Sequence, residues 1–170
     1  PISREPWEHG WAALGVAETQ AQLGDLDAAV AALDTLREHS DPEVRMQASI
    51  RRSQLAAVAE DWDTALSALP SSETTEMGAA WDASITAARA GALVGAGDSD
   101  GAQSAYKALA KRWPDDEEAF LPAWLGLAQL AQNEGDDAEA HRWARKAFRS
   151  ASDPGYRRQA RDLVKTLDSD

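Results

Sequence analysis

The segment LGDLDAAVAAL, residues 23–33, recurs in altered form three times along the chain. The other copies are AEDWDTALSAL (59–69), AGDSDGAQSAY (96–106) and EGDDAEAHRWA (134–144). When the copies are aligned on their second residues, Gly24, Glu60, Gly97 and Gly135, they lie 36, 37 and 38 residues apart. A period in this range predicts a solenoid of small units, each made of a helix, a tight turn and a second helix.

Alanine-rich stretches with helical periodicity flank every copy of this segment. The longer stretches precede the turn, at 7–23, 43–59, 76–96 and 118–134, and shorter ones follow it, at 26–39, 62–69, 99–113 and 137–151. We therefore expect an all-α fold, a right-handed α-solenoid of about four helix pairs (5–40, 42–70, 75–114 and 116–151) with a C-terminal capping helix at 154–168. We expect residues 1–170 to form a single domain, and the opening Pro1 in place of Met indicates part of a longer protein.

Proline and glycine mark the expected helix ends. Asp41-Pro42 and Asp153-Pro154 place an N-cap acceptor directly before a proline at the first helical position. The glycine of three copies sits where a helix must end in a left-handed conformation, and Glu60 takes that position in the second copy. Pro122 is expected to start a helix, and the alternative is a kinked helix that begins near Asp116.

Composition excludes several classes of function. The chain has 170 residues, no cysteine and a formal net charge of −12. The lack of cysteine excludes disulfides, thiolate zinc sites and cysteine nucleophiles. An acidic chain is unsuited to general nucleic-acid binding, because phosphate contacts require a basic surface. No run of about 18 apolar residues occurs, so no membrane-spanning segment is expected here.

Positive charge is concentrated near the C-terminal end. Residues 137–170 hold eight Lys/Arg against six Asp/Glu, a net charge of +2, so the remainder of the chain carries −14. One interpretation is a set of solvated helix faces, and the other is a basic docking strip on an acidic body. The basic strip consists of Arg142, Arg145, Lys146, Arg149, Arg157, Arg158 and Arg161.

The fourth repeat carries a family pattern. Its residues Trp124, Leu127, Ala128, Gly135, Ala140 and Ala147 have the mutual spacings of the tetratricopeptide repeat, which the chain resembles over nearly its whole length. The first three repeats lack the large residue at the start of the first helix, and the periods exceed the usual length of the family. Two helices approach closely only where small side chains meet, and alanines supply those points at 17, 29, 90, 102, 128 and 140.

Three stretches show a narrower similarity. ASIRRSQLAAVAEDWDTALSAL (48–69) and ARAGALVGAGDSDGAQSAYKAL (88–109) are similar to the tetratricopeptide-like ancillary subunits of the bacterial Sec translocon. YKALAKRWPDDEEAFLPAWLGLAQ (106–129) is similar to envelope repeat proteins of the Tol-Pal cell-division machinery. These similarities imply a bacterial envelope protein, periplasmic or membrane-anchored facing the periplasm, in preference to a cytoplasmic one.

In the tetratricopeptide family, ligands lie in a concave groove lined by the first helix of each pair. The resemblance places in this groove Trp11, Leu14, Glu18, Gln47, Ile50, Gln54, Ser84, Gly91, Leu125, Gln129, Gln132 and Asn133. Amides and small apolar side chains suit an extended peptide or a helix, because amides bond to main chain without demanding a charge. An ordinary polar surface is the alternative. Leu14 and Glu18 stand where some relatives begin a carboxylate clamp, so we expect no chaperone-tail binding.

Tryptophan is frequent, with seven in the chain. Trp124 at its repeat position is expected in the core, and Trp62 and Trp143 on second helices are expected to pack against neighbouring helices. Trp7 and Trp11 lie four residues apart on one helix face. That face could pack on an upstream repeat, serve a partner or fold into the core.

Catalytic patterns are missing from the sequence. No HExxH, phosphate loop, nucleophile elbow or dinucleotide fingerprint occurs, and no cofactor or metal is expected. The acidic stretch DDEE (115–118) and the pair Glu60-Asp61 are interpreted as helix N-termini rather than cation sites. The sequence predicts a non-catalytic scaffold or adaptor that binds a protein partner through the groove or an end of the stack. A homo-oligomerisation module and a regulatory domain attached to an upstream enzyme or receptor are the alternatives.

Overall fold

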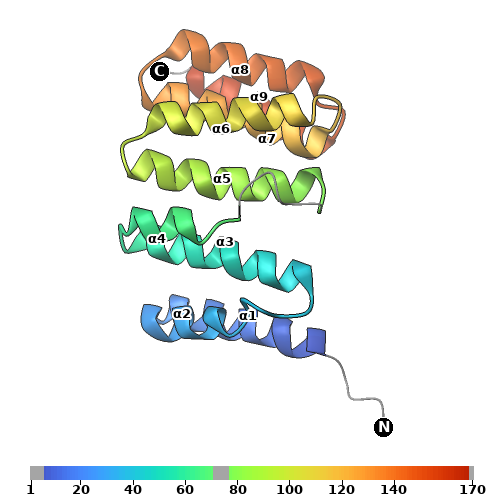
Figure 1. Cartoon of the computed structure of the whole chain (residues 1–170). Helices are drawn as coiled ribbons and strands as arrows, with labels where there is room; N and C mark the ends of the chain where they lie inside the picture. The colour runs from blue at the N-terminus through green and yellow to red at the C-terminus, as the bar shows by residue number, and fades with distance from the viewer. Residues whose placement is uncertain (1–5, 71–76, 169–170) are drawn as a thin grey trace. The chain divides into compact units, whose positions relative to one another are not determined.

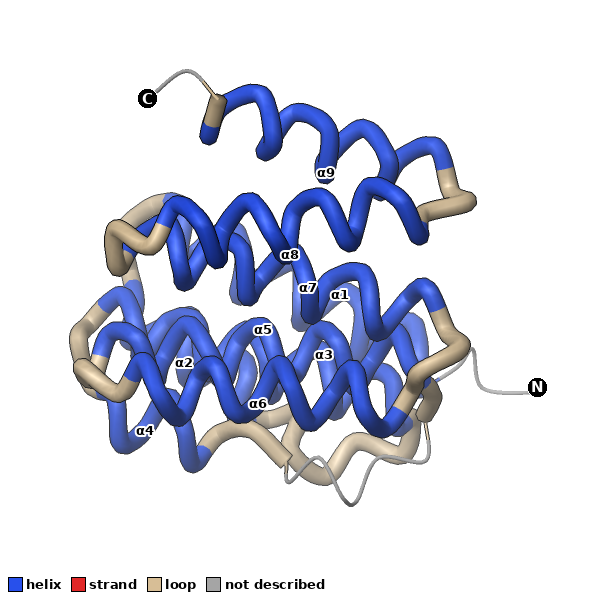
Figure 2. Tube along the Cα trace, turned by 90° about the horizontal axis from the view of Figure 1, so that it is seen from above, coloured by secondary structure: helices blue, strands red, loops and turns tan. Residues whose placement is uncertain are grey.

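The computed structural model describes residues 6–70 and 77–168, with side chains from His9 onward. These residues form nine α-helices and no strand (Figures 1 and 2). The prediction of an all-α chain of four helix pairs and a terminal helix is confirmed. The chain divides into two compact units, residues 1–70 and 71–170. The handedness of the whole stack and the extent of a single domain stay predictions.

Unit 1 holds two helical hairpins. The first pairs α1 (Pro6–Gln22) with α2 (Leu26–Asp34), and the second pairs α3 (Pro42–Val58) with the short α4 (Trp62–Ser67). Helix α3 also packs against α1 and α2. The core of this unit is formed by Leu14, Ala17, Leu33, Leu36, Val44 and Ala48.

Unit 2 holds two further hairpins and the terminal helix. Helix α5 (Ala79–Gly95) pairs with α6 (Ser99–Arg112), and α7 (Glu117–Asn133) pairs with α8 (Asp137–Ser150). Helix α7 also packs on α5 and α6, which joins the two hairpins. Helix α9 (Pro154–Leu167) lies along α8 and covers the last hairpin, as Figure 2 shows.

The repeated segment forms the same reversal in all four hairpins. Its second residue has a positive φ in every copy: 82° at Gly24, 56° at Glu60, 84° at Gly97 and 76° at Gly135. The N–H of the following aspartate bonds back to the carbonyl five residues earlier, as in Asp25 to Gln20 at 3.0 Å and Asp98 to Leu93 at 2.8 Å. This is the hydrogen bond of the Schellman motif, which satisfies carbonyls that a helix end leaves unpaired. The predicted left-handed helix end at Glu60 is therefore confirmed.

The aspartate after each reversal caps the second helix. The Asp25 carboxylate accepts a hydrogen bond from the Ala28 N–H at 3.0 Å, and Asp61, Asp98 and Asp136 do the same for α4, α6 and α8. A cap of this kind stabilises a helix by about 1 kcal/mol. Each copy thus ends one helix and begins the next within two residues, which explains why the sequence repeats it.

Small residues bring the paired helices together as predicted. The alanines at 17, 29, 90, 102, 128 and 140 are each at most 2% exposed. Trp124 is not a fully buried core residue as expected, since it is only partly buried on the surface of a core cluster. Its ring lies 4.6 Å from that of Phe120, and the Lys146 ammonium lies 4.1 Å from its centroid. Trp62 and Trp143 are also partly buried, which agrees with packing roles.

Two expected helix boundaries are wrong. Pro122 does not start a helix but lies inside α7, whose N-cap is Asp116 with its carboxylate on the Glu118 N–H at 3.0 Å. The alternative start near Asp116 is confirmed. Pro122 has no backbone N–H and so cannot donate one hydrogen bond within the helix. The burial of residues 119–121 stabilises the turn before the proline and offsets this loss. Helix α2 ends at Asp34 rather than 39, and a turn leads from Thr35 toward α3.

Candidate partner-binding grooves

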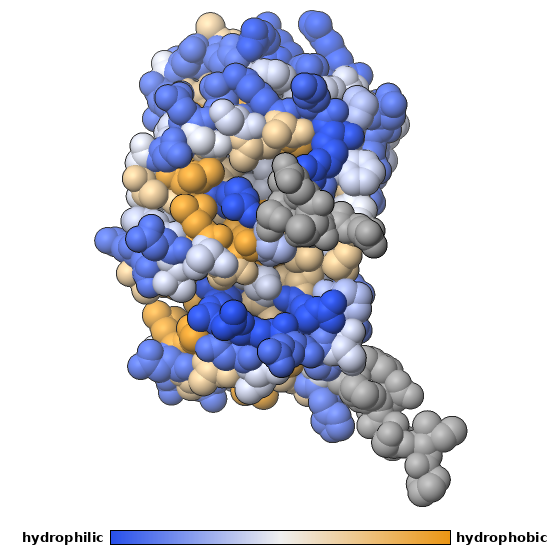
Figure 3. Space-filling view, in the orientation of Figure 1, coloured by the Kyte–Doolittle hydropathy of each residue, from blue (hydrophilic) through white to orange (hydrophobic). Residues whose placement is uncertain are grey.

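A groove of about 330 Å³ opens between α1, α2 and α3 of unit 1. Its floor is apolar and its rim is polar. The floor consists of Ala17, Ala21, Leu26, Leu33, Leu55 and Val58, and the rim consists of Glu18, Gln22, Arg51 and Gln54. We call it the α1–α3 groove. In Figure 3, hydrophobic surface shows at the left edge of unit 1 among hydrophilic side chains.

The apolar floor reaches the surface at the ends of the helices. Val58, the last residue of α3, is 70% exposed, and Leu23, directly after α1, is 76% exposed. Single exposed apolar residues are ordinary on protein surfaces, but exposed apolar residues beside a concave apolar floor mark an interaction site. The groove therefore suits large apolar side chains of a ligand.

Charged and amide groups define the rim. The Arg51 guanidinium on α3 pairs with the Glu18 carboxylate on α1, with 3.3 Å between Nη1 and Oε2. The Nε of Arg51 is buried and has no hydrogen-bond acceptor in the part of the chain that the structure describes. Within that part, this N–H therefore lacks the partner that buried donors in folded proteins almost always have. Gln54, one turn away on α3, is exposed and offers both a donor and an acceptor.

The structure places the predicted groove residues of unit 1 in three environments. Glu18 and Gln54 line the α1–α3 groove. Trp11 is 40% exposed and Gln47 is partly buried, but neither lines this groove. Leu14 and Ile50 are buried, so their expected place on a ligand-binding surface is wrong. Leu14 belongs to the core because its face of α1 turns toward α2. The side chain of Trp7 lies outside the described residues.

The predicted residues of unit 2 lie mainly on α7. The Gln129 amide donates to Gln132 Oε1 at 2.9 Å and to Asn133 Oδ1 at 3.2 Å, so these three amides form one exposed cluster. Leu125 packs against the core instead. Ser84 and Gly91 are exposed on α5. The predicted groove draws on both units, so as one continuous surface it stays a prediction.

The basic strip separates into residues with different roles. Arg145, Arg149 and Arg161 line a second groove, of about 310 Å³, together with Phe148, Val164 and Lys165. We call it the α8–α9 groove. Arg157 donates through Nε to the Ala151 carbonyl at 3.0 Å and so holds the turn between these helices. Arg142 binds Glu139 and lies 5.0 Å above the Trp143 ring, and Arg158 is exposed outside the groove.

The acidic stretches act as helix caps, as the sequence indicates. Asp116 caps α7, and the Glu117 carboxylate accepts hydrogen bonds from the backbone N–H groups of Ser152 and Asp153 at 3.0 and 3.1 Å. Asp61 caps α4, and hydrogen bonds from Thr64 lower the pKa of its carboxyl. Within residues 6–70 and 77–168, no three His, Cys, Asp or Glu side chains gather where they could hold a metal ion.

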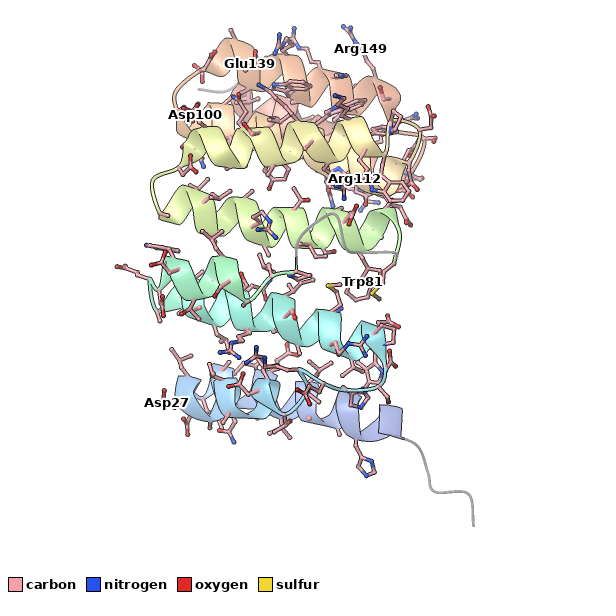
Figure 4. The ribbon with its side chains drawn as sticks, viewed as in Figure 1. Asp27, Trp81, Asp100, Arg112, Glu139 and Arg149 are labelled. Atoms are coloured by element: carbon pink, nitrogen blue, oxygen red, sulfur yellow. The ribbon has the colours of Figure 1, made fainter. Side chains whose placement is uncertain are left out.

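A buried carboxylate lies in unit 2 but serves structure. Asp82 is 1% exposed, and its Oδ2 accepts from the Arg112 guanidinium at 3.0 Å and from the Trp113 indole N–H at 2.8 Å. Figure 4 shows Arg112 at the end of α6 beside the start of α5. Sequence reasoning missed this site, because both partners lie about 30 residues further along the chain.

The four hairpins and their repeated reversals define a helical-repeat protein. The family model of the tetratricopeptide repeat-like domain matches residues 9–122, and the chain belongs to this family. No curated protein matches the sequence. Among the described helices, none combines the length and hydrophobicity needed to cross a bilayer.

Proposed function

We propose that the chain is a non-catalytic protein-interaction module that binds a segment of a partner protein in the α1–α3 groove. The apolar floor of this groove, open to the surface at Val58, is the observation that carries the proposal. Members of tetratricopeptide-like families commonly bind protein partners, which agrees with it.

The chemistry of the groove specifies the ligand. A volume of about 330 Å³ accommodates one or two large apolar side chains and excludes a folded domain. The exposed Gln54 amide at the rim can bond to main-chain groups, which every peptide offers. The ligand is therefore a short segment with an apolar anchor, and the rim holds its backbone.

A displayed peptide library selected on the purified protein tests this proposal. The expected result is a set of enriched sequences that share a large apolar residue. Val58→Glu places a carboxylate at the edge of the apolar floor and should weaken binding of these peptides by about tenfold or more.

Val16 supplies a matched control. It is a valine on α1, 51% exposed, and it does not line the groove. Val16→Glu should therefore retain the affinity of the unchanged protein. If both variants bind the selected peptides equally well, or if no sequences are enriched, the α1–α3 groove is not the binding site.

The role in the bacterial envelope rests on resemblance alone and stays a prediction. So do self-association and regulation of an attached enzyme or receptor, for which the described residues supply no specific observation.

A further inference from the structure

The α8–α9 groove combines an apolar floor with a cationic rim. Phe148 on α8 and Val164 on α9 form the floor, and Phe148 is 39% exposed. The rim consists of Arg145, Arg149, Arg161 and Lys165. Figure 4 shows Arg149 projecting away from the end of α8. The groove lies within unit 2 and outside the residues that the family model matches, so it is independent of the α1–α3 groove.

The same sequence pattern on two adjacent helices builds this groove. RKAFR (145–149) and RDLVK (161–165) each place a basic residue, an apolar residue three positions later and a second basic residue directly after it. Residues with spacings of three and four share one face of a helix. Since α8 and α9 pack side by side, each contributes one apolar residue and two cations to the shared groove.

The three arginines of the rim differ in their ion pairs. Arg145 lies 3.8 Å from Asp168 and Arg161 lies 3.2 Å from Asp162, as measured between their closest charged atoms. Arg149 is exposed and makes no ion pair with any residue in the described part of the chain. Arg149, unpaired among the described residues, gives the rim a local positive charge on a protein whose net charge is −12.

We propose that the α8–α9 groove binds an acidic segment of a partner protein that carries a large apolar side chain. The apolar side chain packs on Phe148 and Val164, and the flanking carboxylates pair with the arginines of the rim. Arginine suits this task because its planar guanidinium can bind a carboxylate through two parallel hydrogen bonds.

The charge of the rest of the chain favours a peptide over other anionic ligands. Residues 1–136 carry a net charge of −14, which repels extended polyanions such as duplex nucleic acid and anionic membranes. A short acidic segment contacts only the local cationic rim. The apolar floor adds a preference that phosphate backbones do not satisfy, since they present no large apolar side chain to it.

The test measures fluorescence anisotropy of a labelled peptide of glutamate and serine with one central phenylalanine, titrated with the full chain. The expected result is saturable binding that weakens as salt rises. Replacing the phenylalanine of the peptide by serine should weaken binding by about tenfold, because the apolar contact is lost. Arg149→Glu in the protein should weaken binding by about tenfold or more, because attraction becomes repulsion at the rim.

Arg158→Glu is the matched control. Arg158 is an exposed arginine on α9 that does not line the groove and makes no ion pair with a described residue, so both variants change the net charge of the protein equally. Arg158→Glu should weaken peptide binding by no more than about threefold. Circular dichroism should show unchanged helicity in both, since both positions are exposed. Val58→Glu in the α1–α3 groove should leave this binding unchanged, which separates the two sites.

Three outcomes would overturn the proposal. The first is an acidic peptide that does not bind, and the second is equal weakening by Arg149→Glu and Arg158→Glu, which would indicate non-specific attraction. The third is tighter, Arg149-dependent binding of duplex DNA or of vesicles that contain phosphatidylserine, which would assign the groove to a different class of partner.

Discussion

Trp113 donates its indole N–H to the carboxylate of Asp82, with 2.8 Å between Nε1 and Oδ2, and so ties the end of α6 to the start of α5. The Arg112 guanidinium binds the same oxygen at 3.0 Å. Asp82 is almost fully buried, and these donors replace hydrogen bonds that its carboxylate would make to water. The hairpin of α5 and α6 is therefore closed by a polar contact as well as by apolar packing.

Asp82→Ala should lower the free energy of unfolding by about 2–4 kcal/mol, because it removes the acceptor of a partly buried indole N–H and one partner of the Arg112 guanidinium. Chemical denaturation followed by circular dichroism measures this change. Asp115→Ala, at an exposed carboxylate in the loop before α7, should change stability by less than about 0.5 kcal/mol. Equal effects of the two substitutions would show that the Asp82 contacts contribute nothing to stability.

Glu60 occupies a left-handed backbone position that glycine adopts without steric cost. Glu60→Gly should therefore be neutral or stabilise the protein by up to about 1 kcal/mol, read as an unchanged or higher melting temperature.

Glu134 provides the matched control for this substitution. It is the exposed glutamate just before the equivalent position Gly135, and its φ of −84° is right-handed. Glu134→Gly should destabilise by up to about 1 kcal/mol, because glycine loses more backbone entropy there. A clearly lower melting temperature for Glu60→Gly would contradict the strain that we assign to Glu60.

The sequence predicts most of the fold because the repeated segment encodes local geometry. A left-handed residue followed by a capping aspartate fixes where one helix ends and the next begins, and both signals act within a few residues. Pro122 shows the limit of such local signals. Proline is common in the first turn of a helix, and only the burial of residues 119–121 shows that α7 begins earlier.

The two candidate grooves are less predictable than the fold. The rotation of α1 about its own axis decides which of its residues face α2. Leu14 and Glu18 lie one turn apart, so a modest error in the predicted rotation is enough to place the core residue Leu14 in the groove beside Glu18. The arginines of the α8–α9 groove were visible in the sequence as a basic strip. The floor formed by Phe148 and Val164 was not, because it exists only where two helices lie together.

Gly126 on α7 lies directly against the ring of Tyr106 on α6. A Cβ atom added at Gly126 would come within 2.3 Å of the ring carbon Cζ, so the ring would have to move. Tyr106 packs against two core clusters, which restrict that movement. Gly126→Ala should lower the free energy of unfolding by about 1–3 kcal/mol, even though alanine is the better helix former.

Gly91→Ala is the control for this prediction. Gly91 lies inside α5, and an added Cβ would meet no described atom within 4 Å. Alanine should therefore raise the free energy of unfolding by up to about 1 kcal/mol, through helix propensity alone. Denaturation curves of both variants measure these changes. An unchanged or raised free energy of unfolding for Gly126→Ala would refute the close contact that we assign to Gly126 and Tyr106.

Glu117 links the start of α7 to the turn between α8 and α9. The Ser152 hydroxyl and the backbone N–H groups of Asp153 and Ser152 bind its carboxylate and hold its pKa below the ordinary value of 4.5. A carboxyl whose pKa is lowered on folding stabilises the folded state fully above its unfolded pKa, and this contribution is lost as the pH falls through the folded pKa. Glu117→Gln removes the charge and should therefore lower the melting temperature at about pH 7 but much less at about pH 3.

The neighbouring exposed Glu118, substituted in the same way, should show a smaller dependence on pH. A melting-temperature difference for Glu117→Gln that stays constant across this range would mean that the ionised carboxylate does not hold the turn.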